Sequence, residues 1–379
     1  MSPQLRLCAH AAEPAARAKE NQEGFRTEET TMKMTFMKGL AVGAVYLASM
    51  VAAPAQDVRL YGASATLDAY HGFLFLGNPL GFYEKEGVSV DFGTAAGSAA
   101  TLQLLASGQV DMGYIGMDVL ILAKRTNPDL PVTAVYLHDR ENIYEIIVPA
   151  DSGINSVADL DGKNIGVANL ASGAIPNLKG MLTDAGLNPN TSVGLIPVGN
   201  GAQAAAALRA GRVDALALFR AQHALIETLG FEFTYFTREA PSAIIAANTR
   251  FLENNRDKVV SVLRGIALGS TFAQANPEEA VREFWKLYGM PQGLTEEEAM
   301  ARSTHVLTGT AQLWKDHRDD SVRWGEMDES HWRIMQDFLI EQRLLDEAVP
   351  MEGLFTTDLL DDVNEVDISP ALELAESRR

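Results

Sequence analysis

The stretch that decides the fold runs Gly97-Ser-Ala-Ala-Thr-Leu-Gln-Leu-Leu-Ala-Ser-Gly108-Gln-Val-Asp111-Met-Gly-Tyr-Ile-Gly-Met-Asp118. It predicts a glycine loop, a helix capped by Ser98, a stop at Gly108 with positive φ, and then a buried strand. The same order of residues returns in Gly199-Asn-Gly-Ala-Gln-Ala-Ala-Ala-Ala-Leu208-Arg-Ala-Gly211-Arg-Val-Asp214-Ala-Leu-Ala-Leu-Phe-Arg220. Two similar units, each with a ligand-sized loop at a helix N-terminus, predict two α/β lobes that face one cleft. Asp111 and Asp214 occupy matched strand starts, where we expect a structural role.

The composition is that of a globular chain long enough for two domains, with 379 residues, 47% hydrophobic and 21% charged. The net charge of −19 argues against nucleic acid or an anionic membrane surface as a partner. It still permits an anionic small ligand, because backbone N–H groups can bind one. Cys8 is the only cysteine, so we expect no disulfide within the chain, no cysteine-ligated zinc and no catalytic thiol. We predict no metal, no cofactor and no catalytic residue.

The N-terminal region has the pattern of a secretory signal that begins late. Residues 1–31 are polar without an apolar period, and we expect them to be a mis-assigned or disordered extension. Residues 32–55 carry a basic start, an apolar run and an Ala-Pro-Ala site, which together predict a signal peptide cleaved after Ala55. Translation from Met32 or Met34 would explain the offset. No cysteine follows the apolar run, so the expected product is a periplasmic protein without a lipid anchor.

Strands alternate with helices from residue 57 to residue 247, which predicts parallel sheets in two α/β layers. The chain then becomes helical, and periodicity predicts helices over 256–275, 277–288, 296–305 and 330–341. All four tryptophans lie in this helical part, where we expect them in the core: Trp285, Trp314, Trp324 and Trp332. The charged tail after Asp367 is expected to fray.

Several spaced motifs resemble one family of transport proteins. They are Gly81-Phe-Tyr-Glu-Lys-Glu-Gly-Val-Ser-Val, Leu105-Ala-Ser-Gly-Gln-Val-Asp111, Leu160-Asp-Gly-Lys-Asn-Ile-Gly-Val167, Met181-Leu-Thr-Asp-Ala-Gly-Leu187, Ala207-Leu-Arg-Ala-Gly-Arg-Val-Asp-Ala215 and Phe355-Thr-Thr-Asp-Leu-Leu-Asp-Asp-Val-Asn. In this order they resemble the periplasmic solute-binding proteins of the nitrate, taurine, sulfonate and thiamine-pyrimidine ABC transporters. The resemblance covers nearly all of 57–367 and does not specify the ligand.

The resemblance implies a type II periplasmic-binding-protein fold, with two α/β lobes, a hinge, and a helical C-terminal extension packed on lobe I. Lobe I is expected over 57–148 plus 242–379 and lobe II over 149–241. The crossings are expected near Ile147–Ser152 and Ala240–Ile244. It also implies a monomer that binds a small-molecule ligand and docks on the membrane permease and ATPase subunits of an ABC importer.

Ligands of open α/β sheets bind at loops that follow strands, so five such loops supply the candidate site. Ser98 and Ser172 stand beside helix starts that suit an anion, although both serines are equally explained as helix caps. Arg220 would clamp a carboxylate or sulfonate, or else pair with an acid. Tyr70, Tyr114, Tyr144 and Phe219 would form an aromatic wall or belong to the core. The predicted ligand-binding residues are Ser64, Thr66, Tyr70, His71, Gly97, Ser98, Ala99, Met117, Asp118, Tyr144, Ser172, Gly173, Ala174, Phe219 and Arg220.

Three functions remain open from the sequence: an importer's binding component, an enzyme like the thiamine-pyrimidine synthases, and a periplasmic ligand sensor. His71 lies ten residues before Gly81, a spacing shared with pyrimidine binders and synthases, although a buried structural histidine would fit equally well. The synthases also carry a cysteine-rich iron motif, which this chain lacks. No signalling domain is attached, so import is the favoured function. The ligand stays open among sulfonates, taurine, nitrate, aromatic carboxylates and pyrimidines.

Overall fold

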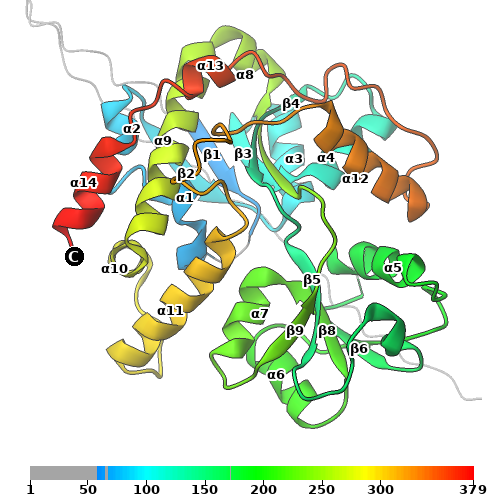
Figure 1. Cartoon of the computed structure of the whole chain (residues 1–379). Coiled ribbons are helices and arrows are strands. Elements are labelled where there is room, and N and C mark those ends of the chain that lie inside the picture. The colour runs from blue at the N-terminus through cyan, green and yellow to red at the C-terminus, as the bar shows by residue number, and fades with distance from the viewer. Residues whose placement is uncertain (1–57, 65–66, 171) are drawn as a thin grey trace, which may run out of the picture. The chain divides into compact units, whose positions relative to one another are not determined.

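The computed structural model describes residues 58–64, 67–170 and 172–379 (Figure 1). The predicted extension, the signal peptide with its cleavage site, and Thr66 lie outside the described residues. The first sheet has the strand order β2-β1-β3-β10-β4. Its members are β1 (Val58–Gly62), β2 (Val90–Thr94), β3 (Met112–Gly116), β4 (Val132–Asp139) and β10 (Ala243–Asn248).

The second sheet has the order β7-β6-β8-β5-β9. Its strands are β5 (Tyr144–Pro149), β6 (Asn164–Val167), β7 (Gly194–Pro197), β8 (Ala215–Phe219) and β9 (Phe233–Phe236). The prediction of parallel sheets holds for β1 with β2 and β3 and for β6 with β7 and β8, but both sheets are mixed. β10 runs antiparallel to β3 and β4, and β5 runs antiparallel to β8 and β9. β5 and β10 are the strands by which the chain enters one sheet from the other, so a helical crossover, which fixes parallel pairing, does not precede them.

The first crossing between the sheets comes earlier than expected. β4 ends at Asp139 in the first sheet and β5 begins at Tyr144 in the second, so residues 140–143 cross, not Ile147–Ser152. Pro149 ends β5 without leaving the sheet, because it is the last strand residue and still lies opposite Phe233. The second crossing covers residues 237–242, which overlaps the predicted one.

The repeated units of the sequence have equivalent structures. In the first, Asp111 accepts from the backbone N–H of Arg59, at 2.9 Å, and pairs with its guanidinium. In the second, Asp214 accepts from the backbone N–H of Asn164, at 2.8 Å. Each carboxylate therefore ties the start of its strand to the neighbouring parallel strand. The predicted structural role of both aspartates is confirmed.

Helices cover both sheets. The first sheet carries η1 (Ala69–His71), α1 (Gly72–Phe75), α2 (Phe82–Lys85), α3 (Ser98–Ser107) and α4 (Met117–Thr126). The second carries η2 (Val157–Leu160), α5 (Ala174–Asp184), α6 (Ala202–Arg209) and α7 (Arg220–Glu227). Gly108 ends α3 with φ 72°, as predicted. Buried hydrophobic clusters lie on each sheet. The described residues belong to one compact unit.

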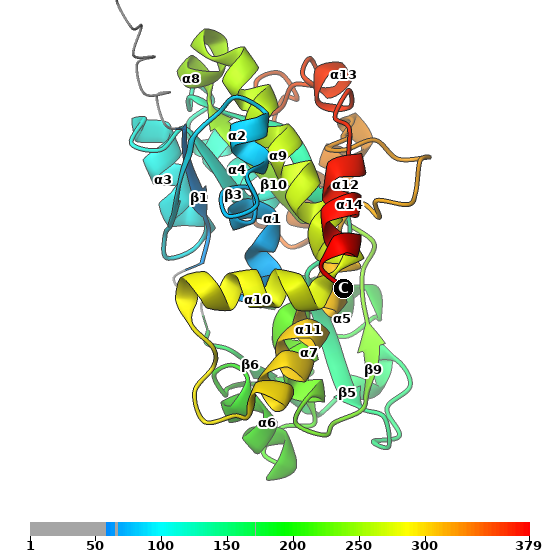
Figure 2. The ribbon, with the colours of Figure 1, turned by 90° about the vertical axis from the view of Figure 1, so that its left-hand side faces the viewer.

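The C-terminal helices are α8 (Thr249–Asn254), α9 (Arg256–Ala275), α10 (Pro277–Tyr288), α11 (Glu296–Ala311), α12 (Glu329–Glu341), α13 (Leu360–Val363) and α14 (Ser369–Ser377). The tail is not frayed: α14 packs beside α9 (Figure 2), with Ala371 and Ala375 buried. The Asn276 side chain also donates to the carbonyl of Ala375, at 2.8 Å. Because Ala371 and Ala375 are small, the two helices can approach closely. The many charged residues around them in the sequence made this short apolar helix face difficult to recognise. Among the described residues, no helix is both long and apolar enough to cross a bilayer.

Candidate functional site

A cavity of about 460 Å³ lies where elements of both sheets meet. Its wall takes residues from the loop after β1, from the starts of α3 and α4, from the ends of β4 and β8, and from the end of α11. These are mostly carboxyl ends of strands and the helix starts that follow them, which is where ligands of such sheets bind. The volume is within the range of small-molecule sites.

Most of the predicted site residues meet in this cavity. They are Ser64, Tyr70, His71, Gly97, Ser98, Ala99, Asp118, Tyr144, Gly173, Phe219 and Arg220. Met117, Ser172 and Ala174 do not line it. Met117 is fully buried among the aliphatic side chains under α4, and Ala174 is buried in the first turn of α5. Met117 and Ala174 do lie in segments that follow strands, as predicted, but their side chains point to the core.

The pair of serines predicted to hold an anion is not assembled. Gly97 (φ 104°), not Ser98, is the N-cap of α3, and Ser98 is the first helical residue. The Ser98 hydroxyl oxygen accepts from the backbone N–H of Gly116, at 3.0 Å, and so joins two loops of the first sheet. The Ser172 oxygen accepts from the backbone N–H of Ala174, at 3.3 Å, outside the cavity wall. Both hydroxyl oxygens therefore have local structural partners.

The Arg220 guanidinium is already paired. Its terminal nitrogen lies 2.9 Å from the carboxylate of Glu145, whose side chain is only 1% exposed, and its carbon lies 4.5 Å above the Tyr235 ring. His223 also reaches Glu145, through Nδ1 at 3.0 Å, while its Nε2 accepts from the backbone N–H of Leu218. Nδ1 therefore carries the proton, and burial lowers the pKa of His223, so the ring is neutral. The charge of Arg220 is therefore balanced by that of Glu145.

Two carboxyl groups line the cavity without an ion-pair partner in the part of the chain that the structure describes. Asp139, at the end of β4, accepts a hydrogen bond from the Tyr114 hydroxyl and is 1% exposed. Burial raises its pKa to about 7, against the lowering effect of the Tyr114 hydrogen bond. Asp118, in the first turn of α4, has its pKa raised by the same loss of hydration. The cavity therefore presents hydrogen-bond acceptors rather than a positive charge.

Aromatic rings form much of the remaining wall. Phe73 stacks on His138 with ring centroids 3.7 Å apart, and Tyr114 and Trp314 both meet Phe73 edge-on at 5.2 Å. Tyr70 lies against His71, at 4.1 Å. The Tyr70, Tyr114, Tyr144 and Phe219 side chains all reach the cavity, as predicted for an aromatic wall.

His71 is buried and neutral. Its Nδ1 accepts from the backbone N–H of Asp68, at 3.1 Å, which leaves the proton on Nε2. Burial lowers its pKa to about 4. His71 thus closes the cap of η1 and also lines the cavity, so the structural and the functional interpretation both stand.

The sequence did not single out Asp139, Phe73 or Thr310 as lining residues, and it assigned Trp314 to the core. Trp314 is in the core, with 5% exposure, and it also lines the cavity. The signal for Asp139 was available, because it stands at the carboxyl end of β4 where the chain leaves the sheet. Its neighbours, His138 and Arg140, gave the segment the pattern of a charged surface loop.

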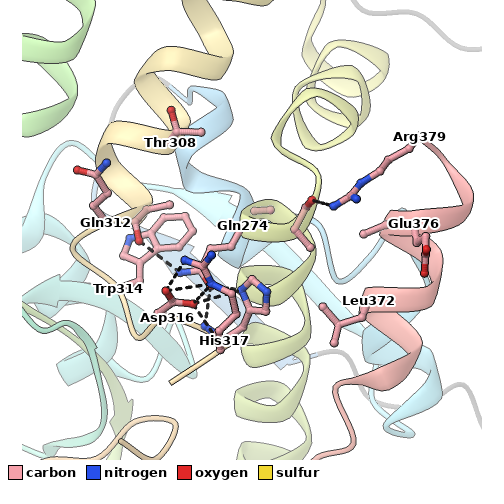
Figure 3. A pocket seen from close by; sticks show the side chains of 14 residues that line it. Gln274, Thr308, Gln312, Trp314, Asp316, His317, Leu372, Glu376 and Arg379 are labelled. Atoms are coloured by element: carbon pink, nitrogen blue, oxygen red, sulfur yellow. Dashed lines mark hydrogen bonds and ion pairs between the residues drawn. The ribbon is translucent and has the colours of Figure 1, made fainter. Parts of the chain in front are cut away.

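A second cavity, of about 650 Å³, lies among α9, α11 and α14 (Figure 3). Figure 3 shows His317 and Asp316 beside Gln274, whose side-chain oxygen accepts from the His317 backbone N–H, at 3.0 Å. Trp314 belongs to the walls of both cavities and separates them. The other lining residues of the second cavity come from the C-terminal helices, from the loop after α11 or from the chain's end after α14. The second cavity therefore lacks the strand-end loops that define the first site.

The two sheets, their crossings and the cavity at their junction define a periplasmic-binding-protein fold, and solved structures agree. The periplasmic aliphatic sulphonate binding protein SsuA from Escherichia coli is 17% identical, with a TM-score of 0.61 over 79% of this chain and 92% of that one. The nitrate-binding protein NrtA from Synechocystis PCC 6803 is 15% identical, with a TM-score of 0.53 over 86% of this chain and 89% of that one. At these identities the comparison shows the fold alone. The predicted fold class is confirmed.

The model of the NMT1/THI5-like family matches residues 68–280, and the chain belongs to that family. The formylaminopyrimidine-binding protein of Halalkalibacterium halodurans is 26% identical over 263 residues, covering 66% of this chain and 78% of that protein. A 4-amino-5-hydroxymethyl-2-methylpyrimidine phosphate synthase of Schizosaccharomyces pombe is 34% identical over 97 residues, covering only 26% of this chain and 28% of that enzyme. The predicted family is therefore confirmed, and the match to an enzyme is partial.

Proposed function

We propose that this protein is the extracytoplasmic solute-binding component of an ABC importer and that its ligand is a small, flat heteroaromatic molecule. The observation that carries the proposal is the cavity of about 460 Å³, which takes its wall from both sheets and is lined by aromatic rings. The periplasmic-binding-protein fold, matched over 79% of this chain, and the relative named as a formylaminopyrimidine-binding protein support it.

The electrostatics of the cavity favour a heteroaromatic ligand over sulfonate, nitrate or carboxylate. Among the described residues of the wall, Arg220 is the only arginine or lysine, and Glu145 neutralises it at 2.9 Å. Ser98 and Ser172 do not form a joint anion site. Asp118 and Asp139 in their ionised forms would repel an anion. Stacking on Phe73, Tyr114 or Trp314 instead suits a planar ring with polar edges.

The two sheets would act as two lobes around residues 140–143 and 237–242. A ligand in the cavity touches elements of both, so it stabilises the closed arrangement by its differential affinity for it. The closed protein would then dock, as a monomer, on the permease and ATPase subunits of the importer. The signal pattern at 32–55 supports a location outside the cytoplasm for this event.

The synthase-like enzyme is the weaker alternative. The sequence has one cysteine, Cys8, which precedes all of the family motifs, so the cysteine-rich iron-binding motif of such enzymes is missing. The similarity to a synthase extends over 26% of this chain. A periplasmic sensor would bind ligand in the same way, and only the partner of the closed state would separate it from an importer component.

The test is a thermal-shift screen of the purified protein against one member of each ligand class: an aminopyrimidine, an aromatic carboxylate, an alkanesulfonate, taurine and nitrate. A bound ligand stabilises the folded state by mass action, by about 2.7 kcal/mol at 100 times its Kd. We expect a rise in the melting temperature with the aminopyrimidine and little change with the anions. Stabilisation by an alkanesulfonate or nitrate alone would overturn the ligand class.

A further inference from the structure

The described residues contain five buried carboxylates, and four of them have a cation as partner. Asp111 pairs with Arg59 at 2.6 Å and Glu145 with Arg220 at 2.9 Å. Glu279 and Glu283 both pair with Arg378, at 3.4 and 2.6 Å. The fifth, Asp139, has no lysine, arginine or histidine within ion-pair distance among the described residues. It is also the only one of the five that lines the cavity between the sheets.

The donors around Asp139 are neutral. The Tyr114 hydroxyl donates to one carboxylate oxygen, and the Trp314 indole N–H lies near without hydrogen-bond geometry. A carboxylate has about four acceptor positions, so acceptor capacity remains. His138, the residue before it, stacks on Phe73 and is neutral, because burial lowers its pKa to about 3.

Burial of a carboxylate without a cation is costly, because the group loses its hydration and gains no opposite charge. Proteins keep such groups mainly at functional sites, where a ligand completes the environment. Asp118, the other carboxyl group in the wall, also lacks a cation partner among the described residues. A ligand that brings N–H donors or positive charge into the cavity would stabilise the ionised forms of both Asp118 and Asp139.

We propose that Asp139, held by Tyr114, determines the specificity of the site by selecting ligands that present an N–H donor edge or a positive charge, and by rejecting anions. An amino group beside a ring nitrogen, as in an amidine or an aminopyrimidine, places two polar atoms along one edge of a flat ring. That edge matches the acceptor capacity of a carboxylate, while the aromatic residues hold the ring. The assignment rests on the proposed function, since it needs the cavity to bind a ligand.

The test uses three probes of one shape: benzamidinium, benzamide and benzoate, which carry charges of plus one, zero and minus one. Calorimetric titration of the purified protein near pH 8 is expected to rank them in that order. Asp139→Asn should weaken benzamidinium by about 10- to 100-fold, the range of a lost charge-assisted hydrogen bond. The same variant should reduce the difference in binding affinity between benzamidinium and benzoate. Asp316→Asn makes the same change in the wall of the second cavity and should leave the affinities of all three probes unchanged.

Two further variants keep the test decisive. Tyr114→Phe removes the hydroxyl that holds Asp139 and should weaken benzamidinium less than Asp139→Asn does. Circular dichroism of each variant shows whether it folds. Preference for benzoate in the wild type, no binding of benzamidinium, or an unchanged probe ranking in Asp139→Asn would overturn the assignment. If aminopyrimidine still binds in any of these cases, the proposed function stands and only the role of Asp139 falls.

Discussion

The replacement of Asp139 by asparagine should stabilise the free protein at alkaline pH and have no effect near pH 4. Burial raises the pKa of Asp139 from 3.8 to about 7, so the folded state holds its proton more tightly than the unfolded chain does. Stability from this group is therefore complete below about pH 4 and is lost as the pH rises toward about 7. The difference in pKa corresponds to about 4 kcal/mol at pH 8, which is an upper limit.

Asparagine keeps the shape and the oxygen that accepts from Tyr114, but it never becomes charged. Urea unfolding followed by tryptophan fluorescence gives the midpoint for both proteins from pH 4 to pH 8. We expect the midpoint of Asp139→Asn to exceed that of the wild type increasingly between pH 5 and pH 8. Groups common to both proteins cancel in this difference. Equal midpoints at pH 8, or a difference that does not change with pH, would refute the uncompensated burial of Asp139.

Three other changes probe the packing and the cavity. A Cβ at Gly180 would lie 2.9 Å from the Phe338 ring, so Gly180→Val should force α5 from α12 and cost about 1–3 kcal/mol in urea unfolding; an unchanged midpoint would show that these helices separate freely. Glu145→Gln should cost about 3 kcal/mol and, by freeing the charge of Arg220, strengthen benzoate binding in calorimetry; weaker benzoate binding would contradict the neutralised pair. Ligand should change the tryptophan fluorescence of the wild type but much less that of Trp314→Phe, because Trp314 is the one tryptophan among the described residues of the cavity wall.

Periodicity and glycine positions were enough to predict the two α/β units and their order. Gly108 has the positive φ that its place after a helix demanded, and α9 and α10 have the predicted bounds. Strand direction was less predictable, because β5 and β10 pair through long-range contacts that no local pattern encodes. The prediction of a frayed tail was wrong for a related reason: α14 is stabilised by the packing of Ala371 and Ala375 on α9, which is a long-range contact.

The location of the site was more predictable than its chemistry. Loops that follow strands are recognisable in sequence, and most of the residues chosen there meet in the cavity. The charge of the cavity depends on partners far away in the chain. Arg220 is neutralised by Glu145 from another strand, and Asp139 has no such partner among the described residues. Spacing in the sequence shows neither, so the sequence left anionic and heteroaromatic ligands both open.

The central claim is that one flat heteroaromatic ligand binds in the cavity between the two sheets. Calorimetric titration with 4-aminopyrimidine, on the wild type and on two blocking variants, tests it most directly. Ala99→Trp fills the cavity between the sheets, and Gln312→Trp places the same bulk in the second cavity. We predict one molecule bound per chain, loss of binding in Ala99→Trp, and wild-type affinity in Gln312→Trp. Binding that survives in Ala99→Trp, or no binding to the wild type, would contradict the claim.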